Sequence, residues 1–180
     1  MTMDSATKIL DIAEFRMRKS GYNAVSFRDI AGEMGIKSAS LHYHFPKKED
    51  LGIALVQRYT ANFMSLLAIR NEGSHAPEDK LRNYVGLFRS AVQADQHLVC
   101  LCAVLGAEAP GLPETVAHEV RAFFEVNITW LTHVFSDLGM TNPSAKAKAS
   151  LALLEGAMII SSVNHDPSVF ETAAELVLAN

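Results

Sequence analysis

The stretch that decides the fold is residues 21–51, which read GYNAVSFRDIAGEMGIKSASLHYHFPKKEDL. Ser26, followed three residues later by Asp29, has the pattern of a capping box, in which each side chain accepts a hydrogen bond from the other residue's backbone N–H. Apolar residues then recur at helical spacing, and Gly35 permits the left-handed backbone that ends a helix. The sequence therefore predicts a short helix over residues 27–34 with a tight turn after it.

A second short helix is predicted over residues 38–44, and its composition is unusual. Leu41 alone on it is suited to a core, with Phe45 at its end, while the other side chains are small or can form hydrogen bonds. Two short helices joined by a turn, the second with a polar free surface, are typical of a helix-turn-helix that reads the major groove of DNA. We expect the DNA-contacting residues to be Ser26, Arg28, Lys37, Ser38, Ala39, Ser40, His42, Tyr43, His44, Lys47 and Lys48.

The residue types suit these roles. Small residues at the start of the second helix allow its N-terminus to approach the duplex, where the helix dipole favours phosphate. The two lysines suit phosphate contacts, although they could also be an ordinary solvated pair, and Tyr43 could pack in the small domain instead. His42 and His44 are two residues apart and point to different sides of a helix, so they do not predict a shared metal site.

Residues 8–55 resemble the DNA-binding domain of the TetR family of bacterial regulators. The matching segments are Gly21-Tyr22, residues 26–31, Gly35-Ile36 and residues 40–51. The resemblance implies a helix-turn-helix domain, which we place at residues 1–48, and a larger ligand-binding and dimerisation domain over residues 49–180. In one departure, the family usually has Tyr at the position of His42. The phosphate contact assigned to that tyrosine could pass to His42 or to the neighbouring Tyr43.

Composition agrees with a globular protein that binds an anion at one end. The chain has 180 residues, of which 49% are apolar and 20% charged. Its net charge is −4, but residues 1–50 hold eight Lys and Arg against seven Asp and Glu, while the rest hold eight against thirteen. The first third is thus the part suited to an anionic partner, although so small an excess could also be chance.

The sequence also indicates where the protein is located and whether it needs a cofactor. The longest apolar run, Leu98–Ala107, is far short of the roughly 20 residues that span a bilayer, and no secretory signal is visible. Cys100 and Cys102 fit a reducing compartment, so we expect a cytoplasmic protein without membrane contact. No phosphate-binding glycine loop or metal signature appears, so no cofactor or metal is expected. His97 and Cys100 share a helix face, which is only a weak metal signal.

An all-α fold is predicted along the whole chain, because no segment alternates as a strand does and prolines precede the long periodic segments. The expected helices cover residues 5–20, 27–34, 38–44, 47–70, 77–94, 98–108, 113–138, 143–163 and 167–179.

A polar residue, Asn127, interrupts the apolar stripe of the helix predicted over residues 113–138. A buried amide there needs a partner from the protein, water or a ligand. It could anchor a ligand in an aromatic pocket, or it could bond a neighbouring helix as a structural residue. We expect the ligand-binding residues to be Tyr84, Phe88, Cys100, Phe123, Phe124, Asn127 and Trp130.

Small residues recur at helical spacing on the helix predicted over residues 143–163, beside a bulkier apolar row. Two such strips indicate burial on two sides, one in the domain and one against a partner, although a second intrachain contact would also explain them. The family resemblance implies that the last two long helices of each subunit pair as a four-helix bundle. We expect the dimer interface to include Ala149, Ala152, Gly156, Ile160, Val169, Ala173 and Leu176.

The leading functional hypothesis is a homodimeric transcriptional repressor that a small-molecule effector releases from a double-stranded DNA operator. Residues 100–108 are similar to the corresponding part of electrophile-sensing family members, which would make Cys100 a sensor, although an inert buried thiol is the alternative. A small thiol-dependent helical enzyme and a helical interaction module are further alternatives. No helix collects an acid, a base and a nucleophile, so we expect no enzyme.

Overall fold

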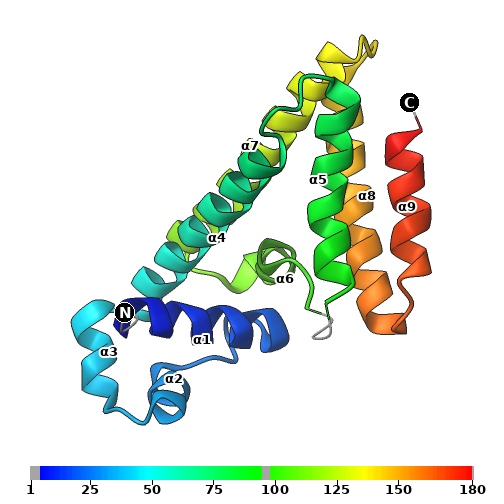
Figure 1. The fold of residues 1–180 in the computed structure, drawn as a ribbon. Coiled ribbons are helices and arrows are strands. Elements are labelled where there is room, and N and C mark those ends of the chain that lie inside the picture. The colour runs from blue at the N-terminus through cyan, green and yellow to red at the C-terminus, as the bar shows by residue number, and fades with distance from the viewer. Residues whose placement is uncertain (1–4, 95–97, 180) are drawn as a thin grey trace. The chain divides into compact units, whose positions relative to one another are not determined.

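The computed structural model describes residues 5–94 and 98–179, and within these ranges the chain contains helices and no strands (Figure 1). The all-α prediction is therefore confirmed. The helices of the described part are α1 (Ser5–Ser20), α2 (Phe27–Met34), α3 (Ser38–His44), α4 (Lys48–Arg70), α5 (Pro77–Val92), α6 (Leu101–Ala107), the 3-10 turn η1 (Ala109–Gly111), α7 (Glu114–Asp137), α8 (Pro143–Asn164) and α9 (Ser168–Leu178). Nowhere in the described ranges is a helix long and apolar enough to cross a membrane.

The helix predicted from residue 98 begins only at Leu101, which corrects the sequence expectation for α6. Residues 98–100 have no helical structure. The backbone N–H of Cys100 instead donates to the thioether sulfur of Met158, at 3.2 Å, and the local apolar pattern contains no sign of this tertiary contact. The other predicted ends differ by at most two residues, which is the usual uncertainty at a helix end.

Polar side chains accept backbone hydrogen bonds at the starts of two helices in the second half of the chain, Asn142 as the N-cap of α8 and Asp166 from the position before Pro167, the N-cap of α9. Asn142 Oδ1 accepts a hydrogen bond from the backbone N–H of Ala145, at 3.3 Å, at the start of α8. Asp166 Oδ1 accepts one from Ser168, at 2.9 Å, at the start of α9. Each carboxyl or amide oxygen satisfies a backbone N–H that the first turn of a helix leaves without a partner.

The chain folds into two compact units, and neither is continuous in sequence. The first consists of Met1–Thr60 and Leu101–Phe123, and the second of Ala61–Cys100 and Phe124–Asn180. The helices α4 and α7 therefore each contribute to both units. The domain boundary that we expect after residue 48 stays a prediction.

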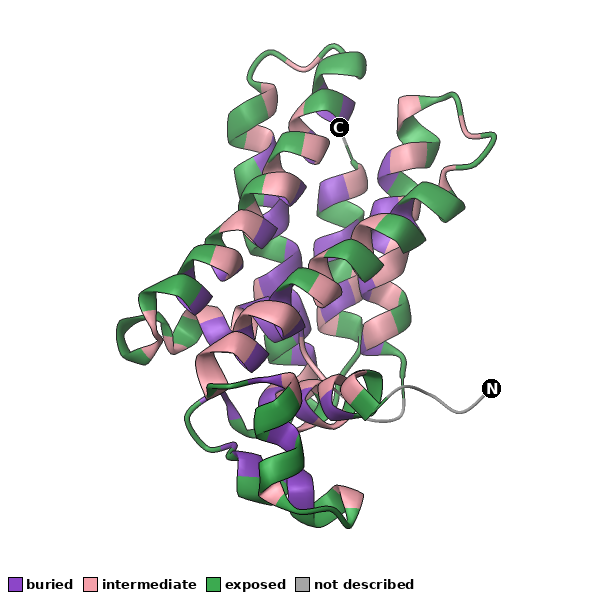
Figure 2. Cartoon of the chain, turned by 90° about the vertical axis from the view of Figure 1, so that its left-hand side faces the viewer, coloured by how far each residue is buried: buried purple, intermediate pink, exposed green. Residues whose placement is uncertain are grey.

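Helices α1, α2, α3 and α6 supply a small apolar core to the first unit. Ile9, Ala13 and Met17 recur every four residues on α1 and are fully buried, as are Ile30 of α2 and Leu41 of α3. Figure 2 shows such buried residues as stripes along the helices, with exposed residues on the opposite sides. This core fixes the positions of α2 and α3.

The junction between α1 and α2 is held by a residue far along the chain. Gly21 has φ +82°, in the left-handed region that favours glycine. One carboxylate oxygen of Glu108 accepts a hydrogen bond from the backbone N–H of Tyr22, at 2.8 Å. A Cβ atom at residue 21 would overlap that same carboxylate. Glycine is therefore required here both by conformation and by space.

In the second unit, α5, α8 and α9 pack side by side (Figure 1). Their facing sides bury Tyr84 of α5, Leu154 of α8 and Phe170 of α9 completely. Arg89 of α5 and Glu171 of α9 form an ion pair at 2.8 Å along the edge of this packing. The three helices thus enclose a core rich in aromatic residues.

Candidate functional site

The turn between α2 and α3 has the geometry of a helix-turn-helix. Ser26 Oγ accepts from the backbone N–H of Asp29, at 3.3 Å, and Asp29 Oδ2 accepts from the N–H of Ser26, at 2.9 Å, so the predicted capping box is present. At the other end of α2, Gly35 has φ +67°. The N–H of Ile36 then donates to the carbonyl of Ala31, at 3.0 Å, which closes the turn and sets the direction of α3.

Helix α3 leaves most of its surface exposed. Leu41 is its single buried residue, whereas Ala39, Ser40, His42 and Tyr43 are exposed. A short helix that is anchored by one leucine and presents small and hydrogen-bonding side chains can enter a groove without a clash. The exposure of these side chains therefore agrees with the prediction that α3 is polar because most of its surface is free to contact DNA.

Two neighbouring aromatic residues on α3 have different environments. The His42 ring lies 4.9 Å from the Phe27 ring, and its Nδ1 is 3.1 Å from the carbonyl oxygen of Pro46. Tyr43 is 86% exposed, and its ring lies 5.2 Å from the ring of the neighbouring His44. His42 is thus held by its own domain, whereas the Tyr43 hydroxyl projects outward and is the better placed to reach a phosphate or a base.

The two lysines that follow α3 also differ. The Nζ of Lys48 lies 4.3 Å from the centroid of the Tyr22 ring, in a cation–π contact. Partial burial lowers the pKa of Lys48, against the opposing effect of the Glu108 and Asp29 carboxylates. Burial of the Tyr22 hydroxyl raises the pKa of Tyr22 to about 12. Lys48 is therefore also a structural residue, so its replacement is a poor test of DNA contact alone.

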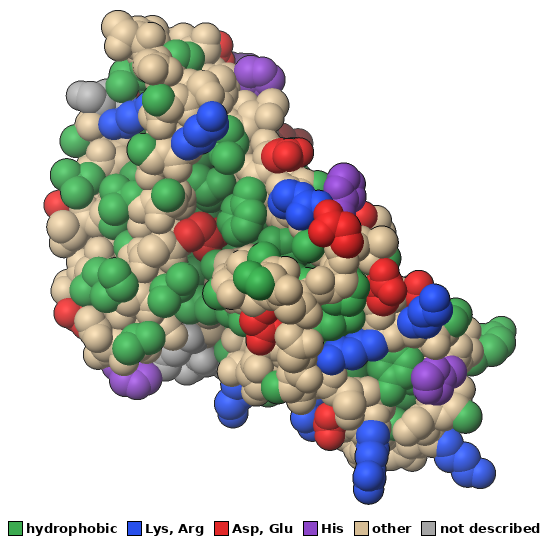
Figure 3. Space-filling view, turned by 180° about the vertical axis from the view of Figure 1, so that it is seen from behind, with side chains coloured by type: hydrophobic (Ala, Val, Ile, Leu, Met, Phe, Trp, Pro, Cys, Tyr) green, Lys and Arg blue, Asp and Glu red, His purple; other side chains and the backbone are tan. Residues whose placement is uncertain are grey.

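Other cations of the first unit are more available. Arg28, Lys37 and Lys47 are exposed, and within the described part of the chain the side chains of Lys37 and Lys47 have no recorded ion pair. In Figure 3, Lys and Arg side chains gather around the lower end of the view. A surface of this kind attracts the phosphates of a nucleic acid.

The second unit brings together four of the residues predicted to bind a ligand. The Tyr84 hydroxyl donates to Asn127 Oδ1, at 2.9 Å, and both residues are fully buried. The Trp130 ring stacks on Tyr84 at 5.2 Å, Phe88 lies 5.5 Å from Tyr84, and Phe63, which the sequence did not single out, lies 5.8 Å from it. Asn127 thus has a protein partner in this conformation, and its role towards a ligand stays a prediction.

Two other residues predicted to line the ligand pocket, Phe123 and Phe124, belong to different units. Phe123 belongs to the first unit, where its ring lies 5.7 Å from Tyr59. Phe124 belongs to the second unit and is partly exposed. Residue spacing on one helix could not show this, because α7 contributes to both units.

Both cysteines are buried, and Cys100 lies beside an acidic residue that sequence reasoning missed. Cys100 is 4% exposed and Cys102 is fully buried. The Cys100 thiol faces the carboxyl of Glu155 on α8, and Glu155 is 7% exposed. Glu155 is the only charged residue between Lys148 and Asp166, and this isolation was the available signal. His97 lies outside the described residues, and no group of three metal-binding side chains occurs among the described ones.

Glu155→Gln should remove a pH dependence of stability. Burial, with a smaller effect of Cys100, raises the pKa of Glu155 well above its ordinary 4.5. The folded protein keeps this proton while the unfolded chain loses it, so wild-type stability should fall relative to the variant as pH rises from 4.5 towards the raised pKa. Thermal unfolding of both proteins between pH 4 and 8 measures this. A constant difference in Tm across the range would contradict a protonated buried carboxyl.

The side of α8 that faces away from the core of the second unit is apolar and exposed. Ala149 and Ala152 are exposed, Ile160 is 50% exposed, and a Cβ atom added at Gly156 would meet no atom within 4 Å. Leu176 of α9 is 60% exposed. Of the other predicted interface residues, Val169 is partly exposed, but Ala173 is buried in the chain's own core at 5% exposure. Val163, at 73% exposure, extends the same apolar surface and was not predicted.

Comparisons with known proteins agree with these features. Residues 6–55 match the family model described as bacterial regulatory proteins, tetR family. The biofilm operon icaADBC HTH-type negative transcriptional regulator IcaR of Staphylococcus epidermidis is 29% identical over 122 residues, which are 68% of this chain and 63% of that protein. The match therefore spans less than two thirds of this curated relative.

Two solved structures match nearly the whole chain. A TetR transcriptional regulator from Legionella pneumophila has a TM-score of 0.91 and 30% identity, with 98% of this chain and 97% of that chain covered. A TetR family transcriptional regulator from Agrobacterium tumefaciens has a TM-score of 0.91 and 33% identity, with 97% and 95% covered.

The helix-turn-helix at the N-terminus and the larger helical unit define a DNA-binding transcriptional regulator. With whole-chain identity of 30% or more to two regulators of one family, the chain belongs to the TetR family.

Proposed function

We propose that this chain is a homodimeric repressor that binds a two-fold symmetric DNA operator through α3 and leaves it when a small molecule binds in the second unit. The observation that carries the proposal is the exposure of α3. Its single buried side chain, Leu41, anchors it, while Ser40 and Tyr43 project into solvent. In this arrangement α3 supplies base contacts, and Lys37 and Lys47 supply phosphate contacts.

The apolar surface of α8 and α9 supports a dimer. An exposed strip that contains Ala152, Ile160 and Val163 is costly in water and suits a second copy of itself across a two-fold axis. The open space beside Gly156 allows two helices to approach closely. A dimer places two copies of α3 at one helical repeat of DNA, or a multiple of it.

Repression is the mode that the relative's name supports, since IcaR is a negative transcriptional regulator. The burial of Cys100 and Cys102 favours a reversible ligand over an electrophile sensor or a thiol-dependent enzyme. A reactive cysteine needs an accessible thiolate, and neither sulfur is on the surface of the described structure.

Selection of DNA from a randomised duplex pool by the purified protein tests the proposal. The expected product is an inverted repeat whose half-sites are separated by about 34 Å along the helix axis, or a multiple of this. Binding should weaken steeply with salt because phosphate contacts release counterions. A reporter with the selected site across its promoter should then be silenced by the protein. If no sequence is enriched at low salt, DNA recognition by α3 is wrong, and if the reporter is activated, repression is wrong.

A further inference from the structure

Residues 22–48, which contain α2 and α3, form a loop of chain whose two ends meet, and we call this segment the helix-turn-helix loop. The Tyr22 ring at its start lies 4.3 Å from the Nζ of Lys48 at its end. The same ring packs against α4, where a Cβ atom added at Gly52 would lie 2.9 Å from it. The base of the loop is therefore closed through one aromatic side chain, and the position of this base sets where α2 and α3 begin and end.

Glu108 holds this base from outside the loop. It directly follows α6, which packs against α1 in the first unit. One oxygen of its carboxylate accepts hydrogen bonds from the backbone N–H of Tyr22, at 2.8 Å, and from that of Asn23, at 3.4 Å. Hydrogen bonds to an ionised carboxylate are stronger than those between neutral groups, so this contact fixes the backbone at the point where the chain enters the loop.

The same carboxylate acts on the other end of the loop. Partial burial lowers the pKa of Lys48, and the negative charge of Glu108 opposes this effect. The absence of a Cβ atom at Gly21 leaves room for the carboxylate beside the backbone. Glu108 is thus close to both ends of the helix-turn-helix loop, at the backbone of Tyr22 and near the ammonium group of Lys48.

We propose that Glu108 is a positioning residue for DNA recognition, which holds the base of the helix-turn-helix loop so that α3 presents its side chains in one orientation. This inference rests on the proposed function. Its expected effect has the opposite sign to simple electrostatics, because loss of a negative charge normally strengthens binding to a polyanion. Loss of Glu108 should instead weaken specific binding, since base contacts require α3 to be in place, whereas nonspecific binding depends mainly on charge.

The test measures the affinity of the full chain for two duplexes, the one selected from the randomised pool and one of scrambled sequence and equal length. Glu108→Ala should lower affinity for the selected duplex by about tenfold, which is the size of one lost base contact. Its affinity for the scrambled duplex should stay the same or rise, by less than about threefold, because one negative charge is gone. Amide hydrogen exchange at Tyr22 should become faster in the same variant.

Glu108→Gln separates the hydrogen bond from the charge. Its amide oxygen can still accept from the backbone N–H of Tyr22, so its affinity for the selected duplex should stay within about threefold of wild type. Glu114→Ala is the control for net charge, since it removes one acid at an exposed position of α7. This control should not lower the affinity for the selected duplex.

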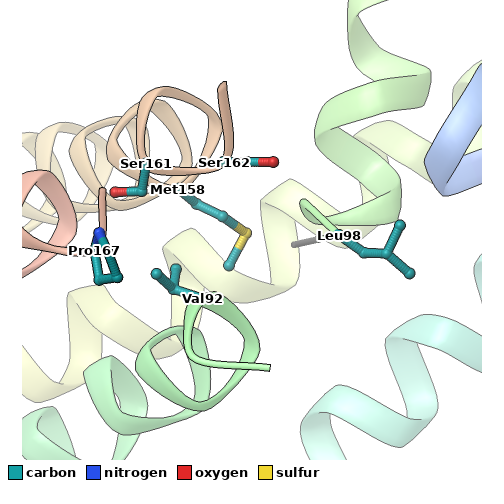
Figure 4. A pocket seen from close by; sticks show the side chains of 6 residues that line it. All are labelled: Val92, Leu98, Met158, Ser161, Ser162 and Pro167. Atoms are coloured by element: carbon teal, nitrogen blue, oxygen red, sulfur yellow. The ribbon is translucent and has the colours of Figure 1, made fainter. Parts of the chain in front are cut away.

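Val92→Ala is the control for lost stability. Val92 is buried in the second unit and borders a cavity of about 10 Å³, room for about one water molecule (Figure 4). Its truncation enlarges this cavity and should lower the Tm. The ratio of the affinities for the two duplexes should nevertheless stay as in wild type, because a smaller folded fraction lowers both affinities alike.

A Glu108→Ala protein with the wild-type ratio of affinities would overturn the positioning role. A Glu108→Gln protein as impaired as Glu108→Ala would also overturn it, because the hydrogen bond would then not be the contact that matters. A wild-type protein that does not prefer the selected duplex would overturn the proposed function, and this inference with it. The wild-type measurement alone therefore distinguishes the two failures.

Discussion

Ala152→Phe is expected to give a monomeric protein that no longer binds its operator at concentrations where wild type is saturated. Ala152 lies on the exposed apolar side of α8, and Gly156, one turn later, faces open space. A phenyl ring at residue 152 has room in the isolated chain but would separate two closely packed α8 helices. A single half-site retains only part of the contacts, so operator affinity should fall by about a hundredfold or more.

Sedimentation equilibrium and gel-shift titration measure the two effects on the same preparation. Ala61→Phe is the matched control, since Ala61 is an exposed alanine of the long helix α4. The control should remain dimeric and bind DNA as wild type does. A dimeric Ala152→Phe protein with normal operator affinity would show that the exposed side of α8 is not the interface.

Tyr43→Ala is expected to lower operator affinity by about 10- to 100-fold, in line with the loss of a specific base or phosphate contact on the recognition helix. Tyr43 is 86% exposed and makes no recorded contact with the core, so the free energy of unfolding should change by less than about 0.5 kcal/mol. Tyr43→Phe separates the contribution of the hydroxyl to operator affinity from that of the ring, because it removes the hydroxyl and keeps the ring. Gel-shift titration and chemical denaturation provide the two readouts.

A contrast with Lys47→Ala shows what kind of contact is lost. Lys47 is exposed and suits a phosphate, so its removal should weaken binding to all sequences alike and reduce the salt slope by about one unit. Phe15→Ala, a truncation of an exposed α1 side chain outside the predicted DNA contacts, should leave operator affinity unchanged. If Tyr43→Ala binds the operator as tightly as wild type, α3 does not read DNA in the way proposed.

The N-terminal helices could be predicted from sequence because their signals are local. The capping box at Ser26, the glycine at residue 35 and the four-residue repeat on α1 each act within a few residues, and the ends of α1, α2 and α3 agree with the structure. The start of α6 could not be predicted in this way. Leu98, Val99 and Cys100 continue the apolar pattern of a helix. In the structure, however, the backbone N–H of Cys100 donates to Met158, 58 residues later, and these three residues are not helical.

The candidate sites also divide into features that depend on nearby residues and features that depend on residues far along the chain. The polar surface of α3 follows from its own composition, whereas the environment of a residue in the second unit depends on which helix faces it. Asn127 was recognised as needing a partner, but only the structure shows that the partner is Tyr84. Glu155 is an isolated charge in the sequence, but sequence reasoning missed it, and its burial beside Cys100 is known only from the structure. Ala173 fits a surface stripe by spacing and is nevertheless buried, because periodicity does not say which side of a helix a neighbour covers.

The discontinuous first unit has a consequence for how the protein is made. Its core needs Leu105 and Val116, and Val116 packs next to Gly52, while Glu108 closes the turn at Tyr22. During translation, the residues up to Thr60 are synthesised before Leu105, Glu108 and Val116. At about 5–20 residues per second the delay is several seconds. During that interval the nascent DNA-binding segment carries uncovered apolar side chains, so it is prone to aggregation until residues 101–123 are available.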